Sequence, residues 1–395
     1  MMKVVGGVYS EYCYDPHWHQ IFGSGGRGAA ALKVLGVPKV ELHSCLPNNG
    51  ERTVAASLNS YGMELHNIRS SPINEFRYTH PLSEPQWNKK PGPLECIGSI
   101  CDDCIVAYGM VEGYVTLSGK TIIYDPQAED AETPLDKIII SSERLALVLN
   151  EREVIRMGDS ENYVNAAQRL LNNSGAQVII VKRGPYGCSV IENGNIATIP
   201  VYQSSKIFKI GTGDIFTAAF AYYWSQKNFK ASEAADAASR CVSAYAETQS
   251  IDAIVEQNVN NRKPILVKRK PKVYLAGPFF SLSQRFLIEE AKRALESLSA
   301  DVFSPLHEVG LEDTPQEIAT ADLRGLDQCT AILALITDLD VGTIFEIGYA
   351  TAKDIPVVAY SEGVKDEHLT MLMGSGCVCS SDFCSAIYQS IWAAV

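Results

Sequence analysis

The stretch that decides the fold of this chain reads ITDLDVGTIFEIGYA, residues 336–350. It continues an aliphatic strand, AILALI (331–336), into an acidic turn with a glycine, after which a helix is expected to carry Glu346 in its first turns. Open α/β sheets build their sites in this way, at the carboxyl ends of their strands. The apolar neighbours of Glu346 favour a poorly solvated carboxylate, which suits a nucleophile. The competing interpretation is an acidic helix start stabilised by the helix dipole.

A second strand and turn precede this stretch. The segment KVYLAGPFF (272–280) predicts a short strand that ends in a Gly-Pro turn, and Asp322 lies in the helix expected before the aliphatic strand. In order, Tyr-Leu-Ala-Gly-Pro at 274–278, the Asp322 helix, Asp340-Val-Gly and Glu346-Ile-Gly-Tyr-Ala resemble the nucleoside 2-deoxyribosyltransferase family. The resemblance covers about residues 272–376. It implies a smaller flavodoxin-like (Rossmann-type) α/β domain with a parallel sheet.

By that resemblance, Glu346 attacks the anomeric carbon of a deoxyribose, expels the base and forms a covalent glycosyl-enzyme. Tyr274 orients Glu346, while Asp340 and Asp322 hold the sugar hydroxyls and handle the proton on the base. A C–N glycosidic bond breaks through an oxocarbenium-like state that a carboxylate stabilises while an acid protonates the leaving group. Loop residues expected to bind the substrate are Gly277, Pro278 and Gly342. No cofactor is expected for this half, and the choice between hydrolase and transferase, or nucleoside and 5′-phosphate, stays open.

The first two thirds of the chain carry a separate signature, KIGTGDIFTAAFAYYW at 209–224. A glycine turn at a helix start offers backbone N–H groups to an anion, and Asp214 can accept a hydroxyl proton as phosphoryl transfer begins. Alone, this pattern also fits a tight turn. Upstream lie the strand QVIIVKRGPY (177–186), an N-x-x-E motif at 150–153 expected to follow a helix, and GSGGRG (23–28) before a helix over 29–36.

In this order the elements resemble the ribokinase or PfkB family of sugar and nucleoside kinases, which implies a three-layer α/β/α domain. Asp214 is then the catalytic base, and ATP with Mg²⁺ is the expected cofactor set. Residues expected to hold the nucleotide and its phosphates are Gly211, Thr212, Gly213, Asn150, Glu153, Lys182 and Gly184. Residues expected at the acceptor are Gly25, Gly26 and Asp15, although an Asp before a proline is also a common turn former.

One departure from the family pattern concerns the acceptor. The asparagine usual after the double glycine is absent, and Gly28-Ala29-Ala30 occupy the region. Two alternatives therefore remain for this domain. It is an active kinase, or it binds a nucleoside or nucleotide without phosphorylating it.

Composition bounds the organisation of the chain. Its 395 residues, 46% of them hydrophobic, suffice for two domains. We expect a kinase-like domain at 1–256, a basic linker at 257–271 and a transferase-like domain at 272–395. A nucleic-acid patch is the alternative for the linker, but the formal net charge of −12 opposes binding to a phosphate backbone.

Apolar segments and cysteines indicate where the protein is located and whether it holds a structural metal ion. No leading apolar segment and no run of 18 apolar residues occurs, so neither secretion nor membrane insertion is implied and a cytoplasmic location is expected. The eleven cysteines are scattered, and the pairs 101/104 and 377/379 lack the second half of a zinc site. We expect reduced thiols and no structural metal site.

Aliphatic runs expected as strands include residues 3–8, 104–107, 121–124, 137–140 and 178–181.

We expect a bifunctional enzyme of nucleoside metabolism in which N-glycosidic bond cleavage is coupled to phosphorylation of a sugar or nucleoside. The alternatives are an inactive kinase-like sensor that controls a nucleotide-depleting N-glycosidase, and a non-catalytic nucleotide-binding subunit. Expected partners are small nucleosides or nucleotides and further copies of the chain, because the tail at 369–379 resembles segments that complete a neighbouring subunit's pocket. Its alternative is a methionine-rich core segment.

Overall fold

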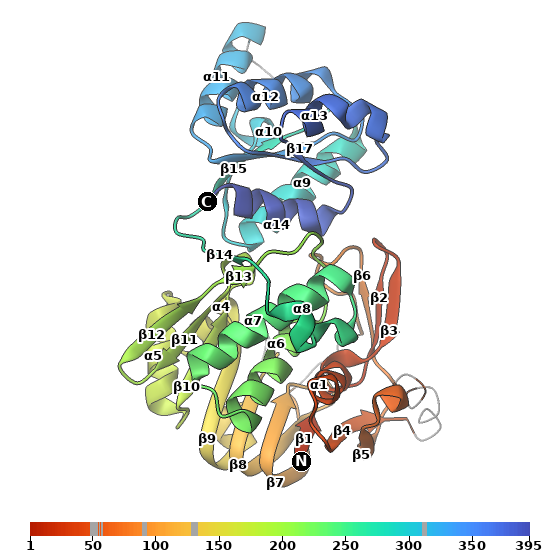
Figure 1. Ribbon diagram of the computed structural model, residues 1–395, viewed down its shortest axis with the longest axis vertical. Coiled ribbons are helices and arrows are strands. Elements are labelled where there is room, and N and C mark those ends of the chain that lie inside the picture. The colour runs from red at the N-terminus through yellow and green to blue at the C-terminus, as the bar shows by residue number, and fades with distance from the viewer. Residues whose placement is uncertain (48–53, 55, 57, 89–92, 128–132, 310–313) are drawn as a thin grey trace. The chain divides into compact units, whose positions relative to one another are not determined.

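The chain is described here by a computed structural model that covers residues 1–395 except 48–53, 55, 57, 89–92, 128–132 and 310–313 (Figure 1). It divides into two compact units. The N-terminal unit comprises Met1–Ser204 and Phe208–Pro264, and the C-terminal unit comprises Ser205–Ile207 and Ile265–Val395. The domain limits expected from the sequence stay a prediction. Over the described residues, no helix combines the length and apolar character that crossing a membrane requires.

A nine-stranded mixed sheet forms the centre of the N-terminal unit, in the order β12-β11-β10-β9-β8-β7-β1-β4-β5. The strands from β5 to β10 are parallel, whereas β11 and β12 are antiparallel additions. Their bounds are β1 Met2–Val5, β4 Val40–Leu46, β5 Glu64–Ser70, β7 Cys96–Tyr108, β8 Tyr114–Asp125, β9 Ile139–Asn150, β10 Val178–Lys182, β11 Cys188–Glu192 and β12 Asn195–Ile199.

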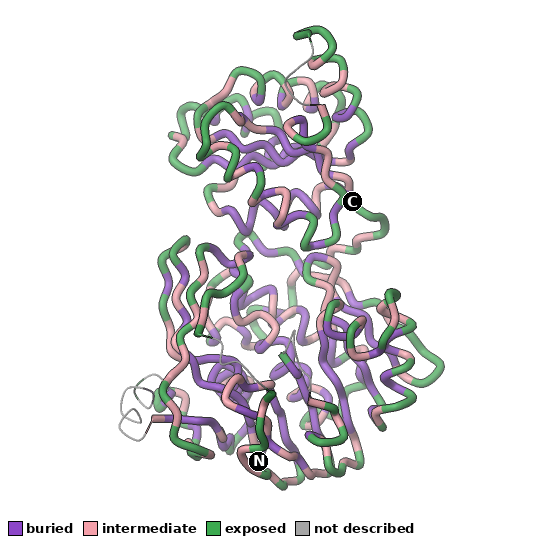
Figure 2. Tube along the Cα trace, turned by 180° about the vertical axis from the view of Figure 1, so that it is seen from behind, coloured by how far each residue is buried: buried purple, intermediate pink, exposed green. Residues whose placement is uncertain are grey.

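Helices cover both faces of this sheet, because a sheet whose two faces are both apolar must be packed against other elements on each side. One core cluster joins the sheet to α1 (Gly23–Val34), α6 (Thr212–Ala221) and α7 (Ala231–Thr248). A second cluster on the other face includes residues of α4 (Glu151–Met157) and α5 (Tyr163–Asn173). Buried backbone runs along the strands of the sheet, and exposed backbone is concentrated in the connections (Figure 2).

Two of the central strands, β7 and β8, are too long to be straight. β7 and β8 pair in parallel from Cys96↔Tyr114 to Tyr108↔Asp125, although only residues 109–113 connect them. Five residues span too little to return along a whole strand, because a chain advances at most about 3.3–3.6 Å per residue. The strands must therefore bend midway. Only the second half of β7, at Ile105–Ala107, pairs with β1 of the main sheet.

A small sheet of β3 (Trp18–Ile21), β2 (Ser10–Cys13) and β6 (Glu75–Tyr78) completes the N-terminal unit, together with short elements. These are η1 Asn59–Tyr61, α3 Leu135–Ile138, η2 Gly184–Tyr186, β13 Val201–Tyr202, η3 Tyr222–Gln226, η4 Ile251–Ile254, α8 Glu256–Val259 and β14 Pro264–Ile265, which crosses the unit boundary.

Three local expectations were wrong. Residues 137 and 138 belong to α3, so only the second half of the expected strand 137–140 is extended. The N-x-x-E motif follows strand β9 rather than a helix, and the helix expected over 29–36 already begins at Gly23. The early start of α1 has a packing reason, since a Cβ at Gly25 would meet the carbonyl oxygen of Gly6 at 2.5 Å and the glycine lets the helix approach β1 closely.

The C-terminal unit contains five parallel strands in the order β16-β15-β17-β18-β19. Numbered along the chain this order is 2-1-3-4-5, the flavodoxin type, whose sites lie where the order reverses, between β15 and β17. The strands are β15 Lys272–Ala276, β16 Asp301–Phe303, β17 Ala331–Leu335, β18 Val357–Tyr360 and β19 Val378–Ser380. The helices are α9 Leu282–Ser297, α10 Pro305–Glu308, α11 Pro315–Asp327, α12 Val341–Ala352, η5 Asp366–Leu369, α13 Thr370–Gly374 and α14 Phe383–Ala393. The expected α/β class is confirmed.

Candidate active sites

The most developed site of the C-terminal unit pairs a tyrosine of β15 with a glutamate of α12. The hydroxyl of Tyr274, a fully buried residue, donates a hydrogen bond of 2.5 Å to Oε1 of Glu346. The ring of Tyr274 stacks on Phe303 of the neighbouring strand, with centroids 5.5 Å apart. Gly325 of α11 leaves room for Phe303, because a Cβ at this position would lie 2.2 Å from the ring. Packing therefore fixes the direction of the Tyr274 hydroxyl.

Burial controls the charge of Glu346. Desolvation raises the pKa of Glu346 to about 7, the hydrogen bond from Tyr274 opposes that rise, and the charges of Asp322 and Asp340 add to it. A carboxylate with this pKa exists in both protonation states near neutral pH. Because it is poorly solvated, its ionised form is a strong nucleophile for an electron-poor carbon.

Asp340 is held at the N-terminus of α12. Its Oδ2 accepts hydrogen bonds from the backbone nitrogen (2.8 Å) and Oγ1 (2.9 Å) of Thr343, so it caps the helix. A Cβ at Gly342 would lie 3.1 Å from the same oxygen. Leu339, the preceding residue, has a left-handed φ of 52°, a conformation that strains a branched side chain. The turn between β17 and α12 is thus fixed, with Asp340 at the helix start and its charge near enough to act on Glu346.

Asp322 of α11 brings a further carboxyl group toward Glu346. Its Oδ1 is buried and has no hydrogen-bond partner among the described residues. Burial raises the pKa of Asp322. An unpartnered buried polar atom costs about 1–3 kcal/mol, so this oxygen is suited to bind a polar group of a ligand.

The two loops at the carboxyl ends of β15 and β17 are joined by a hydrogen bond. Nε2 of Gln284, which caps α9, donates to Oδ2 of Asp338 over 2.9 Å. Gly277 and Pro278 form the first loop, and a Cβ at Gly277 would lie 3.0 Å from Leu335 of β17. The C-terminal unit thus brings Tyr274, Glu346, Asp322, Asp340, Gly277, Pro278 and Gly342 to the end of the sheet where its strand order reverses. Sequence reasoning missed Phe303, Gly325 and Gln284.

The N-terminal unit places Asp214 in the first turn of α6, after Gly211, which has a left-handed φ of 81°. Oδ2 of Asp214 accepts a hydrogen bond of 2.6 Å from Arg27 of α1. Arg27 also pairs with Glu11 of β2 over 2.5 Å, and Gln127 donates to the other oxygen of Asp214. Arg27 is only 1% exposed. The expected base is therefore the centre of a buried network of charges.

Arg27 also contacts the glycine turn itself. A Cβ at Gly211 would lie 2.4 Å from Nε of Arg27, and this Nε has no hydrogen-bond partner among the described residues. Burial raises the pKa of Glu11, and the charge of Arg27 opposes that rise. Sequence reasoning missed Arg27, Glu11 and Gln127. The one signal available was the arginine inside the glycine run at 23–28.

A second charged cluster lies beside α6. Asp125 at the end of β8 is fully buried and accepts hydrogen bonds from Lys182 (2.6 Å) and Thr217 (2.8 Å). Its Oδ1 has no hydrogen-bond partner in the described part of the chain. Burial, followed by the charge of Asp125, raises the pKa of Glu153 to about 7. Asn150 and Glu153 also form a capping box at the start of α4, which gives both a structural role.

The three residues expected to bind the acceptor do not take part in the network around Arg27 and Asp214. Asp15 is exposed in the turn between β2 and β3, and Glu11 is the carboxylate of β2 that reaches Arg27. Gly25 and Gly26 lie inside α1, where a Cβ at Gly25 would meet the carbonyl oxygen of Gly6 at 2.5 Å. Gly184 begins η2, and Thr212 and Gly213 open α6.

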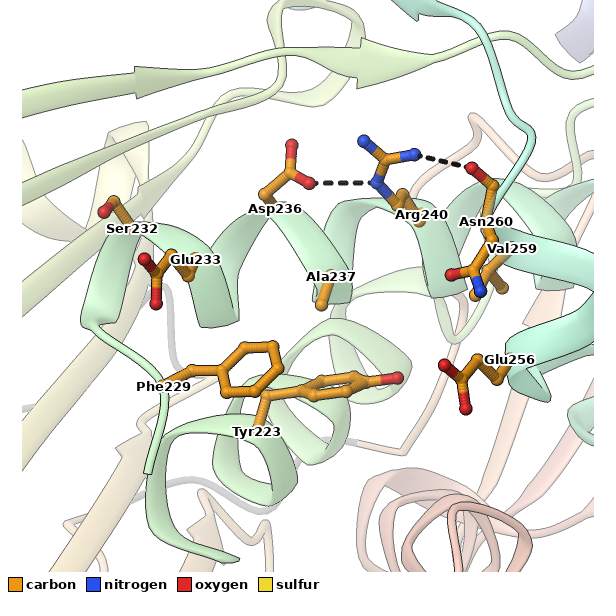
Figure 3. A pocket seen from close by; sticks show the side chains of 10 residues that line it. All are labelled: Tyr223, Phe229, Ser232, Glu233, Asp236, Ala237, Arg240, Glu256, Val259 and Asn260. Atoms are coloured by element: carbon orange, nitrogen blue, oxygen red, sulfur yellow. Dashed lines mark hydrogen bonds and ion pairs between the residues drawn. The ribbon is translucent and has the colours of Figure 1, made fainter. Parts of the chain in front are cut away.

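A pocket of about 460 Å³ lies among η3, α7 and α8 (Figure 3). Its lining includes the aromatic pair Tyr223 and Phe229, and Arg240 is held by Asp236 (2.9 Å) and by the carbonyl oxygen of Asn260 (3.2 Å). None of the expected site residues lines this pocket. The charged groups of Arg240 and Asp236 are paired with one another across this pocket.

Comparison with known families identifies both units. Residues 273–378 match the nucleoside 2-deoxyribosyltransferase family, and residues 115–257 match the pfkB family of carbohydrate kinases. The chain therefore combines a PfkB carbohydrate kinase domain with a nucleoside 2-deoxyribosyltransferase domain. Both resemblances expected from the sequence are confirmed. A comparison with curated proteins found no match.

Solved structures add the fold of the N-terminal unit. Ribokinase from Thermotoga maritima is 14% identical, with a TM-score of 0.50 over 66% of this chain and 97% of that chain. Fructokinase from Vibrio cholerae O395, in a form with fructose, ADP and calcium, is 12% identical, with a TM-score of 0.48 over 64% of this chain and 96% of that chain. The ribokinase likeness shows that the N-terminal unit has a ribokinase-like fold.

The Tyr274→Phe variant tests the charge control of Glu346. Loss of a hydrogen bond that favours the carboxylate raises the pKa of Glu346 further, and a bond to a charged group is worth about 1.5–3 kcal/mol. We expect the midpoint of the Glu346 titration, followed by carboxyl ¹³C NMR, to move up by about 1–2 pH units. Tyr349→Phe, whose hydroxyl donates to Asp327 instead, is the control and leaves the midpoint in place. A midpoint that stays or falls in Tyr274→Phe contradicts this arrangement.

Proposed function

We propose that the C-terminal domain cleaves the N-glycosidic bond of a nucleoside or nucleotide, with Glu346 as the nucleophile. The observation that carries this proposal is the 2.5 Å hydrogen bond from buried Tyr274 to Glu346. It holds a carboxyl group with a pKa near 7 at the end of the sheet where α/β folds bind ligands.

The reaction uses the two states of neighbouring carboxyl groups. Ionised Glu346 attacks the anomeric carbon, the C–N bond breaks, and the sugar becomes an ester of Glu346. Asp322, with its raised pKa, is the group suited to protonate the departing base. Asp340, fixed by Thr343, is suited to hold a sugar hydroxyl. Water or a second base then takes the sugar and frees Glu346.

For the N-terminal domain we propose a nucleotide-binding role. The backbone N–H groups of residues 211–213 offer an anion site at the start of α6, and Lys182 lies near, since a Cβ at Gly213 would be 3.5 Å from its Nζ. Asp125, with an unpartnered Oδ1, and Glu153 are carboxylates that fit Mg²⁺. A bound Mg²⁺ would neutralise phosphate charge there.

The hydrogen bonds of Asp214 bear on whether this domain is an active kinase or a nucleotide sensor. An active kinase requires Asp214 to take a proton from the acceptor hydroxyl. Here both carboxylate oxygens of Asp214 are engaged, by Arg27 and by Gln127. Neither oxygen is therefore free to accept a hydroxyl proton without losing an existing hydrogen bond, and the buried guanidinium adjoins Gly211, next to the expected transfer site. This observation favours a nucleotide sensor that controls the glycosidase over a coupled kinase.

Assembly of the C-terminal domain into a homo-oligomer is a further part of the proposal. In the segment 369–379, Met371 and Met373 are exposed, at 79% and 58%, whereas Leu369 and Leu372 are buried. Exposed methionines disfavour the core interpretation and suit an adaptable contact surface. Size measurement in solution tests this part.

The nucleophile is tested by Glu346→Ala. We expect release of free base from a panel of (deoxy)nucleosides and their 5′-phosphates to fall at least roughly a thousandfold, because an alanine side chain cannot form the sugar ester. The matched control is Glu296→Ala, an exposed carboxylate of α9 paired with Lys292, which keeps full activity. Mass spectrometry of the products measures both. Unchanged base release in Glu346→Ala overturns the assignment.

The sensor version predicts no ATP consumption by the wild-type chain. With Mg-ATP and pooled sugars and nucleosides, ADP formation stays at background in the wild type and in Asp214→Asn, and base release per folded chain is the same in both, with folding checked by circular dichroism. Asp252→Asn, an exposed carboxylate of the same domain, is the control. ADP formation that wild type shows and Asp214→Asn loses establishes an active kinase instead.

A further inference from the structure

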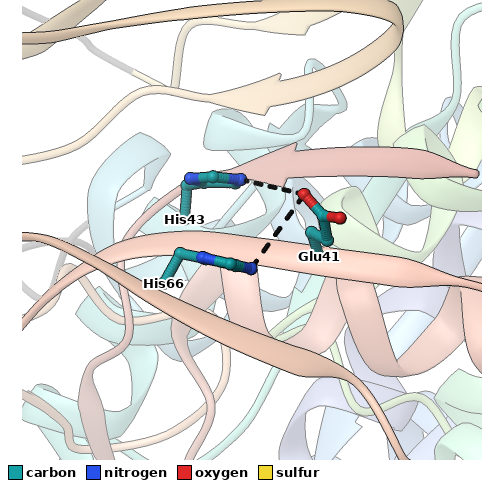
Figure 4. Close-up of side chains that lie close together, drawn as sticks. All are labelled: Glu41, His43 and His66. Atoms are coloured by element: carbon teal, nitrogen blue, oxygen red, sulfur yellow. Dashed lines mark ion pairs between the residues drawn. The ribbon is translucent and has the colours of Figure 1, made fainter.

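A third cluster of reactive side chains lies on the edge of the nine-stranded sheet, on β4 and the outermost strand β5 (Figure 4). Glu41 and His43 are two residues apart on β4, so their side chains project from the same face. His66 on β5 is the direct register partner of His43. Glu41 and His43 lie toward the amino end of β4, whereas the expected kinase site uses the carboxyl ends of its strands.

The three side chains converge on one point. Oε2 of Glu41 lies 3.6 Å from Nε2 of His43 and 4.0 Å from Nε2 of His66, and all three ligand atoms lie within 4.8 Å of one another. Zinc bonds of 2.0–2.1 Å in tetrahedral geometry place ligand atoms about 3.4 Å apart. The Glu41–His43 pair is close to that spacing. The two imidazole rings are stacked at 4.7 Å, so His66 must tilt to join them.

The position of His66 allows this movement. Its side chain is 45% exposed, and it stands on β5, the last strand of the sheet. Glu41 and His43 are held more firmly, with side chains 12% and 13% exposed. Two fixed ligands and one adjustable ligand are sufficient to close around an ion.

An unsatisfied atom points to a missing partner. Nε2 of His43 is buried and has no hydrogen-bond partner among the described residues, although a carboxylate oxygen lies 3.6 Å away. An imidazole nitrogen next to a carboxylate oxygen, with neither bonded to the other, leaves room for a cation between them. Buried polar groups in this state are uncommon in native proteins.

Neighbouring charges determine how well a cation is accepted. Nζ of Lys39 lies 2.9 Å from Oε1 of Glu41 and 3.2 Å from Oε2 of Glu64, so it holds the outer oxygen of Glu41 and leaves Oε2 facing the histidines. Glu64 also lies 4.0 Å from Nε2 of His66. Lys3, the other nearby cation, is paired with Asp102 over 3.3 Å. The carboxylates of Glu41 and Glu64 thus offset the positive charge of Lys39.

We propose that Glu41, His43 and His66 form a binding site for a divalent transition-metal ion, with Zn²⁺ the best fit and water as the fourth ligand. Two imidazoles and one carboxylate are a zinc ligand set, whereas Mg²⁺ and Ca²⁺ prefer oxygen ligands throughout. The ion joins edge strand β5 to β4 and stabilises the folded domain by mass action. The sequence analysis expected no such site, because the ligands come from two strands and show no motif.

Zinc titration of the metal-free full chain by calorimetry tests this site. The wild-type chain is expected to bind Zn²⁺, and His66→Ala and His43→Ala each weaken the tightest site at least roughly tenfold. His66→Ala is the decisive variant, because an exposed side chain is removed without disturbing the core. The control is His19→Ala, an exposed histidine of β3 that bonds to Ser10, and it binds zinc as wild type does.

A second readout follows the ligand geometry. The visible absorption of added Co²⁺ is expected to report a tetrahedral nitrogen–oxygen site in wild type and in His19→Ala, and to be lost in His66→Ala. The proposal is overturned if wild type shows no saturable zinc binding. It is also overturned if both histidine variants bind zinc as tightly as wild type, since the eleven cysteines would then account for the binding.

Discussion

The hydrogen bond from Tyr274 to Glu346 is the interaction on which the C-terminal domain is organised. A buried carboxyl group resists ionisation, and a hydrogen bond from a fixed donor restores part of the lost solvation. Tyr274 can serve as this donor because Phe303 stacks on its ring and Gly325 leaves space for Phe303. The result is a carboxyl group near neutral pKa whose orientation is set by packing.

The N-terminal domain also buries carboxylates, but it pairs them with a cation instead of a neutral hydroxyl donor. Its glutamate on β2 and its aspartate on α6 are buried as well, and a single guanidinium, that of Arg27, is paired with both of them. Removing one partner from a buried ion pair is strongly destabilising, by about 3–5 kcal/mol, so Arg27 is held in place as firmly as it holds Asp214. The two domains therefore hold their buried carboxylates differently, by a tyrosine hydroxyl in one and by an arginine in the other.

Much of the C-terminal site could be predicted from sequence because its residues lie in local strand–turn–helix units. Glu346, Asp340 and Gly342 fall within a stretch of fifteen residues, 336–350. The N-terminal network could not be predicted from the sequence. Arg27 and Asp214 are 187 residues apart, and their contact depends on how α1 packs against α6. The bent strands β7 and β8 were missed for a related reason, since aliphatic periodicity does not record where a strand turns back. Asp15 was expected as a carboxylate that binds the acceptor, but it lies exposed in a turn, and Glu11 of β2 is the carboxylate that reaches Arg27.

The most direct test of the account is a search for the sugar ester on Glu346. The chain is incubated with a nucleoside that carries fluorine at the sugar 2-position, which slows breakdown of the ester, and the digested protein is analysed by mass spectrometry. The account predicts a mass increase equal to the fluorinated sugar on the peptide that contains Glu346, and no increase in Glu346→Gln. Release of base without any adduct, or with an adduct on another peptide, would contradict it.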